Sequence, residues 1–275
     1  MTCAPNCSAL FISLFIGAWL NSRYGWRMTF FAAGIPALVA AVVVRITVRE
    51  PRSGTLPLAT TSVPSARGVA AALWSQRSSR HLCIAISLFY FMALGITPWY
   101  AAFMMRSHGM TTAEVGTWLG LILGISGTVG ILMGGWVGGR WYASNYRGQM
   151  RLSAVLVGSL VPFYVLFLLL PRKYAALAAL MPLMMAFCFF VGPAYALLQQ
   201  LVPDEMRATT AAIVGLLSNL IGMGIGPQIV GILSDTWHPR LGSDSLRYAM
   251  LTMSFVALWS AWHFWRVGRT VESKV

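Results

Sequence analysis

The sequence predicts an all-α fold, a polytopic helical membrane protein with about eight transmembrane helices. Three observations lead to this prediction: a mean hydropathy of +0.69, a charged fraction of only 10%, and an uneven placement of the charges along the 275 residues. Soluble domains usually contain about 25% charged residues. Eight stretches contain no Asp, Glu, Lys or Arg, and they are 1–22, 28–44, 81–105, 115–139, 152–171, 174–203, 208–234 and 248–265.

These eight stretches have the length that a bilayer requires. A membrane-crossing helix needs about 20 apolar residues, and a charge at its centre costs roughly 2.5–3.5 kcal/mol on insertion scales. The first stretch lacks the basic start and the small-residue cleavage site of a signal peptide, so a membrane span is favoured there. The expected spans are roughly Cys7–Leu20, Met28–Ile46, His81–Met105, Glu114–Gly138, Leu152–Leu170, Tyr174–Gln199, Ala208–Leu233 and Tyr248–Trp265.

The expected spans fall into two groups separated by a hydrophilic segment. A polar turn at Asn21–Arg27 joins the first two spans, and Val48–Arg80 is the long hydrophilic segment before the other six. Its Ala-rich part, Gly68–Trp74, is either an amphipathic helix at the membrane interface, anchored by Trp74, or a flexible linker. The sequence therefore predicts three parts, which are residues 1–47, a cytoplasmic loop of residues 48–80, and a six-helix bundle of residues 81–275.

The net charge of +13 is explained by membrane topology. If Val48–Arg80 lies in the cytoplasm, the inner loops contain 13 Lys and Arg residues and the outer loops contain 7. This asymmetry follows the positive-inside rule and places both termini in the cytoplasm, as expected for a bacterial inner-membrane protein. The basic excess therefore does not indicate nucleic-acid binding.

The sequence predicts no enzyme, metal or cofactor site. Cys83 and Cys188 lie inside expected spans, where a free cysteine usually acts as a small apolar residue. Cys3 and Cys7 have no partner at metal-ligand spacing. The motifs H-E-x-x-H, G-x-S-x-G and Walker A are absent.

Several spaced motifs resemble those of the major facilitator superfamily. The turn Gly25-Trp26-Arg27, with the closing Arg49-Glu50-Pro51, resembles helices five and six of that family. The run Gly134-Gly135-Trp136-Val137-Gly138-Gly139-Arg140 resembles the second copy of its G-x-x-x-D-R loop motif, although Gly139 stands where the family has an acidic residue. Val202-Pro203-Asp204-Glu205-Met206-Arg207-Ala208-Thr209 and the residues that follow it resemble helices ten and eleven of the bacterial Spinster-like branch. The likeness extends to Phe30, Gly34, Pro36, Trp99, Arg106, His108, Glu114, Asn219, Gly222, Pro227, Gly231 and Asp235.

This resemblance implies a secondary-active transporter that moves a small organic or lipid-like solute by alternating access. By the same resemblance, the spans correspond to family helices five to twelve, and the first four helices are absent. Residues 1–47 would then be the last two helices of an N-terminal bundle, and any coupling ion would act through the absent helices. Two alternatives stay open: a membrane fragment inactive in transport, and a generic organic-anion or drug carrier of the same superfamily.

Polar side chains inside the spans are the candidate solute-binding residues, because polar groups are costly to expose to lipid. Asn219 is the strongest candidate, since it lies near the middle of its span and its amide needs partners. The other candidates are Tyr90, Trp99, Ser126, Tyr195 and Gln199. For the tyrosines and the tryptophan, the alternative is anchoring at the membrane interface or ordinary helix packing.

The resemblance also implies a charge network that closes a gate at the cytoplasmic face. The residues assigned to it are Gly135, Arg140, Arg147, Asp204 and Arg207. The alternative is that the charged members only determine topology in water.

Two glycine patterns predict special features of the helices. Gly222, Gly224 and Gly226 precede Pro227 and predict a flexible or kinked helix. Glycines at four-residue spacing allow close approach of a neighbouring backbone, either for sliding or for static packing. They are Gly116, Gly120, Gly124, Gly130, Gly134 and Gly138.

Overall fold

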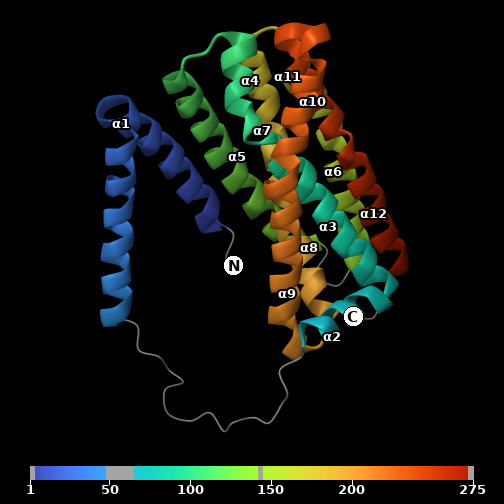
Figure 1. Cartoon of the computed structure of the whole chain (residues 1–275). Coiled ribbons are helices and arrows are strands. Elements are labelled where there is room, and N and C mark those ends of the chain that lie inside the picture. Colours follow the sequence, from blue (N-terminus) through green and yellow to red (C-terminus); the bar gives the residue numbers. More distant parts are fainter. Residues whose placement is uncertain (1–3, 48–64, 142–144, 272–275) are drawn as a thin grey trace.

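The computed structural model of the chain describes residues 4–47, 65–141 and 145–271 (Figure 1). Every element in those ranges is helical, which confirms the all-α prediction. Six segments of these ranges are long and apolar enough to cross a membrane, and one of them, Asp204–Thr270, comprises two successive helical legs. With the two legs of α1 counted separately, the described ranges contain the eight predicted legs and one short additional helix.

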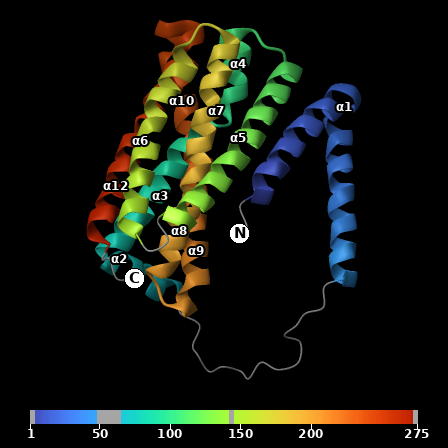
Figure 2. The ribbon, with the colours of Figure 1, turned by 180° about the vertical axis from the view of Figure 1, so that it is seen from behind.

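The first element, α1 (Ala4–Thr47), is a helical hairpin that turns at Gly25. Gly25 has φ 77° and ψ 168°, a conformation that L-residues with a Cβ rarely adopt, and it lies inside the predicted turn Asn21–Arg27. Thr29 Oγ1 donates to the Gly25 carbonyl at 3.1 Å at the start of the second leg. α1 packs beside α5 (Figures 1 and 2). No residue of its apolar segment Arg23–Thr47 is buried.

A short helix, α2 (Ala66–Ser75), precedes the six-helix bundle. The Ser65 hydroxyl caps it by accepting a hydrogen bond from the Gly68 amide at 3.1 Å. Val69 and Leu73 are buried, whereas Trp74 is exposed. The Ala-rich segment is therefore an amphipathic helix, which was one of its two expected forms; residues 48–64 lie outside the described residues.

The remaining six legs form one bundle in which four legs are interrupted. Their elements are α3 (Arg77–Ile96) with α4 (Trp99–His108), α5 (Thr112–Trp141), α6 (Tyr146–Leu169), α7 (Lys173–Phe189) with α8 (Val191–Gln200), α9 (Asp204–Asn219) with the π-helix η1 (Leu220–Ile225) and α10 (Gly226–Leu241), and, after the 3-10 turn η2 (Gly242–Asp244), α11 (Ser245–Ser254) with α12 (Val256–Thr270). α12 packs between α6 and α3, α7 packs between α5 and α6, and α3 packs along α9, η1 and α10.

The largest side chains in the core of the bundle are aromatic. Its largest fully buried side chains include Tyr100, Tyr164, Phe103 and Phe167, which come from α4 and α6. The hydroxyls of Tyr100 and Tyr164 are 2.8 Å apart, so each buried phenol has a polar partner. The two phenylalanine rings stack edge to face at a centroid distance of 5.3 Å.

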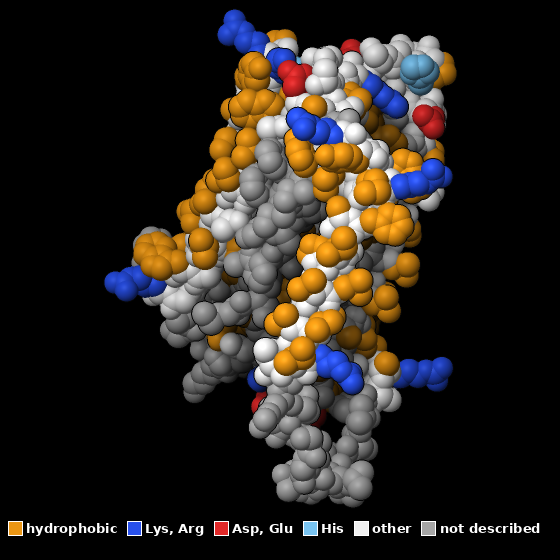
Figure 3. Space-filling view, turned by 90° about the vertical axis from the view of Figure 1, so that its left-hand side faces the viewer, with side chains coloured by type: hydrophobic (Ala, Val, Ile, Leu, Met, Phe, Trp, Pro, Cys, Tyr) orange, Lys and Arg blue, Asp and Glu red, His pale blue; other side chains and the backbone are white. Residues whose placement is uncertain are grey.

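Hydrophobic side chains run along the outside of the molecule, as the face that includes α1 shows (Figure 3). The turns divide between the two ends (Figure 1). One end contains the bend of α1 and the turns after α4, α6 and α10, and the other contains α2, the start of α9 and the end of α12. The loops predicted as outer and those predicted as inner thus lie at opposite ends of the bundle.

Two glycines of the predicted four-residue series hold α5 against α7. A Cβ on Gly130 would collide with the carbonyl oxygen of Met185, and a Cβ on Gly134 would collide with that of Phe189. The next residue, Gly135, has no atom within 4 Å of where its Cβ would stand. The close approach of a neighbouring backbone, predicted from the spacing, is confirmed at these two positions.

We expect Gly134→Ala to lower the apparent melting temperature of the detergent-purified chain. Overpacking costs about 1–3 kcal/mol, which exceeds the roughly 0.5–1 kcal/mol that alanine gains over glycine inside a helix. Gly135→Ala is the matched control, because it gains the same helix propensity in open space, so its melting temperature should stay equal or rise. Equal melting temperatures for the two variants in a thermal-unfolding assay would contradict the contact.

Candidate functional site

α3 crosses the interrupted helix α9–η1–α10 with the two backbones in contact. A Cβ on Gly222 would lie 2.8 Å from the Tyr90 carbonyl oxygen, and a Cβ on Gly226 would lie 2.8 Å from the Gly95 Cα. Such distances leave no room for a side chain on either glycine. This crossing therefore depends on glycine in both helices.

The middle of that helix, η1, is a π-helix that begins directly after Asn219. The backbone N–H of Gly226, which follows η1, donates a hydrogen bond to the Ile221 carbonyl five residues earlier. Pro227 has no N–H to continue the α-helical hydrogen bonds, and this explains why the helix departs from the α form here. The prediction of an irregular helix is confirmed, but the π form was not foreseen; the cluster Gly222, Gly224, Gly226 and Pro227 was its only sequence indication.

Three predicted solute-binding residues lie around this crossing. Trp99, at the start of α4, donates its Nε1–H to the Pro227 carbonyl at 3.1 Å and packs its ring against Gly231. Tyr90 is half-buried on α3, next to η1. Asn219 is exposed, and its Nδ2 donates to the Gly215 carbonyl of its own helix at 2.8 Å. The fold thus places Asn219, Tyr90 and Trp99 on adjoining elements.

The other three candidates lie on α5 and α8. Ser126 is only 1% exposed, and its hydroxyl has no hydrogen-bond partner within the described residues. Tyr195 is half-buried on α8, and Gln199 is exposed near the end of the same helix. α8, which carries Tyr195 and Gln199, contacts both α5 and α3.

The predicted gate residues gather at the end of the bundle where α5 meets α6 and α8 meets α9. Arg140 is exposed at the end of α5 and forms no ion pair within the described ranges. Arg147 donates its Nε–H to the Val271 carbonyl at 2.7 Å. Asp204 pairs with Arg207 at 2.9 Å within the first turn of α9. Asp204, the acidic member of the predicted gate, is thus paired within its own helix in this conformation.

A cavity of about 310 Å³ lies beside these residues. Its glycine-rich wall comes from α5 and includes Gly135, while Gln149 of α6 and Gln200 of α8 supply polar groups. Arg207 closes the α8–α9 turn through an Nε–H hydrogen bond to the Gln199 carbonyl at 2.8 Å. The absence of side chains on the α5 wall leaves room at this end for a group from another helix.

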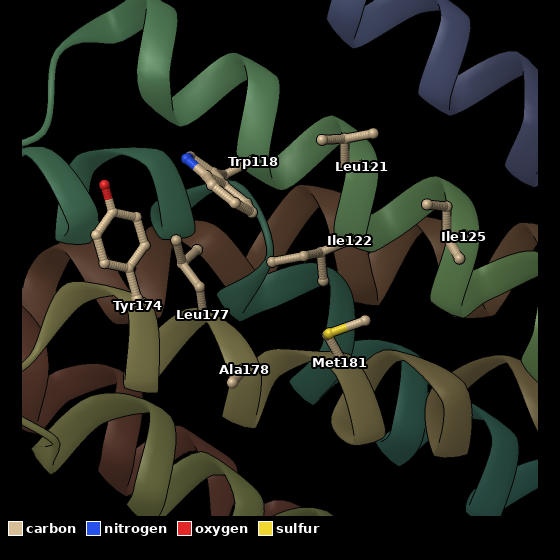
Figure 4. A pocket seen from close by; sticks show the side chains of 8 residues that line it. All are labelled: Trp118, Leu121, Ile122, Ile125, Tyr174, Leu177, Ala178 and Met181. Carbon is tan, nitrogen blue, oxygen red and sulfur yellow. The ribbon is translucent and has the colours of Figure 1, made fainter.

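Two larger cavities are apolar. The first, of about 610 Å³, lies between α5 and α7 and is drawn in Figure 4. Trp118 and Tyr174 line one end of it, and apolar side chains such as Ile125 and Met181 line the other end. The second, of about 430 Å³, lies among α5, α6 and α7. None of the six solute-binding candidates lines either cavity.

Two histidine arrangements could not be predicted from the sequence. His81 and His263, separated by 182 positions, approach to 2.9 Å between their Nδ1 atoms and join α3 to α12. At the opposite end, His108 packs edge to face on Phe103 near Arg247. Burial lowers the pKa of His108, and the positive charge of Arg247 lowers it further.

A bundle of interrupted helices, apolar along its length and charged at its ends, is typical of membrane transporters. The chain belongs to the Major Facilitator Superfamily, whose family model matches residues 6–227. It is 30% identical over 244 residues to an MFS-type efflux pump of Mycolicibacterium smegmatis, a match that covers 88% of this chain and 56% of that protein.

Two solved structures are also similar, and both are crystal structures of a bacterial homologue of the human lysosomal transporter Spinster. The inward-facing, unoccupied form matches with a TM-score of 0.71 at 20% identity and covers 98% of this chain and 65% of that chain. The inward-facing, occupied form matches with a TM-score of 0.69 at 19% identity and covers 98% and 66%. At these identities the likeness concerns the fold. The chain spans little more than half of the efflux pump and about two thirds of each solved structure.

Proposed function

We propose that this chain forms part of a secondary-active transporter that moves a small organic or lipid-like solute by alternating access. The observation that supports this most strongly is the π-helical interruption at η1, packed on α3 through glycine. Transporters place solute sites at interrupted helices. Asn219, Tyr90 and Trp99 surround this interruption and form the proposed solute-binding set, with Ser126, Tyr195 and Gln199 as further members.

A carrier that exports organic solutes or drugs is the second candidate for the substrate class. It is favoured by the relative in M. smegmatis, which is described as an efflux pump. The large apolar cavities beside α5 and α7 suit hydrophobic solutes of either class.

We propose that the domain organisation follows the predicted bounds. Residues 1–47 would be the last two helices of an N-terminal six-helix bundle, 48–80 the cytoplasmic loop, and 81–275 the C-terminal bundle. The packing of α1 on α5 supports a contact between two bundles at this place. The segment Arg23–Thr47 is apolar and exposed, which supports packing of further helices against it.

We expect both termini and residues 48–80 to face the cytoplasm of a bacterial inner membrane, because that side then receives 13 of the 20 Lys and Arg residues. In a background without native cysteines, Ser243→Cys in the exposed turn η2 should react with a membrane-impermeant maleimide on intact cells. Ser53→Cys should react only after permeabilisation. The reverse pattern would show the opposite orientation.

We expect this chain, reconstituted alone, to show no ion-driven accumulation of solute. The eight charge-free stretches contain no carboxylate whose protonation could couple to transport, so such a group would have to come from other helices. The measurement is uptake into proteoliposomes under a proton or sodium gradient, with lysophospholipids, organic anions and drugs. Concentrative uptake that disappears when the gradient is collapsed would contradict this expectation.

Transport itself is tested in a chimera that adds the part of the M. smegmatis pump which this chain does not match. We expect gradient-driven uptake in the chimera and slower uptake in its Arg140→Ala variant at equal membrane abundance, since a gate charge shifts the inward–outward balance by about 1–3 kcal/mol. Arg240→Ala, which removes an exposed arginine at the other end, is the control and should transport normally. If the Arg140→Ala variant takes up solute as fast as the unmodified chimera, Arg140 only determines topology. A chimera without uptake would count against the proposed transport function.

A further inference from the structure

The exposed face of α12 changes from aromatic to basic toward the end of the helix. Trp262, Trp265, Arg266 and Arg269 follow the spacing i, i+3, i+4, i+7 and therefore share one face. All four side chains are exposed, whereas His263 on the other face is buried. This end of α12 lies beside the start of α3 and beside α2 (Figure 1).

Arginines from this face and from a neighbouring helix converge on its tryptophans. The guanidinium groups of Arg151 on α6 and Arg269 on α12 lie 5.7 Å and 5.9 Å from the centroid of the same Trp265 ring. The Arg266 guanidinium lies 5.6 Å from the ring of Trp262. We name these five residues the basic–aromatic surface.

The surrounding packing fixes this arrangement. A Cβ on Gly268 would lie 3.1 Å from Arg151 Cγ, so α12 and α6 are close where the two arginines meet. On the other side, the contact between His81 and His263 holds α3 to α12. Arg80 of α3 extends the positive charge there and stacks on Trp74 at 6.0 Å.

No acidic side chain neutralises this charge within the described part of the chain. The ion pairs found there lie elsewhere and are Lys173–Glu114, Arg207–Asp204 and Arg247–Asp244. Two guanidinium groups on one ring repel each other. An anion bound beside these arginines would reduce that repulsion, and a phosphate matches the planar fork of a guanidinium.

We propose that the basic–aromatic surface binds the phosphate of an anionic phospholipid. A membrane lipid is the occupant because the same exposed face continues from the arginines into apolar side chains, through Trp259 and Leu258 to Phe255. Acyl chains would lie along these residues while the headgroup meets the arginines, and tryptophan favours this boundary. The proposal requires only that the chain spans a bilayer, and it is independent of the transported solute.

The test measures phospholipid bound to the whole purified chain by native mass spectrometry. Phosphatidylglycerol and phosphatidylcholine with the same acyl chains are compared for wild type and for the double variant Arg151→Gln, Arg269→Gln. We expect wild type to retain phosphatidylglycerol in preference to phosphatidylcholine. The variant should bind about tenfold less phosphatidylglycerol, because two interfacial charges are removed.

The double variant Arg23→Gln, Arg27→Gln is the matched control. It removes the same charge and two arginine–tryptophan contacts, which have centroid distances of 5.1 Å and 5.0 Å, at the opposite end of the molecule. Its phosphatidylglycerol binding should equal that of wild type. An equal loss in the control and in the Arg151, Arg269 variant would overturn the proposal, because binding would then follow net charge alone.

Two further measurements cover the remaining outcomes. Inorganic phosphate and glycerol phosphate should bind far more weakly than the lipid, and equal binding would overturn the assignment to a phospholipid. Arg151→Lys with Arg269→Lys keeps the charge but loses the forked geometry, so it should bind phosphatidylglycerol at an intermediate level. If the glutamine variant does not fold, the lysine variant decides the test. A folded lysine variant that binds as much phosphatidylglycerol as wild type would overturn the proposal.

Discussion

Close contact between helix backbones at glycine is the constraint on which this bundle depends. Burial of apolar side chains gives little preference for another helix over lipid, because the lipid tails are equally apolar. Packing at short range must then supply much of the attraction. Gly130 and Gly134 allow α5 to lie against α7, and Gly222 and Gly226 allow η1 and α10 to lie against α3. These two contacts set the positions of four of the six legs of the bundle.

Polar side chains of the described bundle are satisfied within single helices more often than between helices. Thr97, Thr128 and Thr236 each donate to the carbonyl four residues earlier, at 2.7 Å in every case. Contacts such as Tyr100–Tyr164 join separate helices and are fewer among the described residues. A helix that satisfies its own polar groups loses no hydrogen bond when its neighbour shifts, and this would suit the proposed alternating access.

The sequence predicted the features that depend on local periodicity. The spans, the turn at Gly25 and the contacts of Gly130 and Gly134 are consequences of charge placement and residue spacing, whereas for Gly68–Trp74 the sequence left a helix and a flexible linker open. Contacts between distant positions could not be predicted in this way, because no local pattern encodes which helix faces which. His81 and His263 are the clearest example.

The proposed site is therefore only partly predictable from the sequence. Asn219 was chosen for its depth in an apolar span, yet depth does not indicate direction, and its amide lies on an exposed face. Trp99 was chosen as a polar aromatic residue, and its actual bond to the Pro227 carbonyl depends on the break in the partner helix.

The π-helical turn at η1 also determines how the two halves of its leg are oriented. Successive residues of an α-helix are rotated by about 100° around the axis. A π-turn accommodates one extra residue without passing that rotation on to the next helical segment. The buried positions of this leg keep a four-residue spacing across η1, from Ser218 of α9 through Gly222 and Gly226 to Val230 and Ser234 of α10. Homologous chains that differ by one residue at this point can keep the same inward face, so a single-residue gap in an alignment here marks a change of helix type.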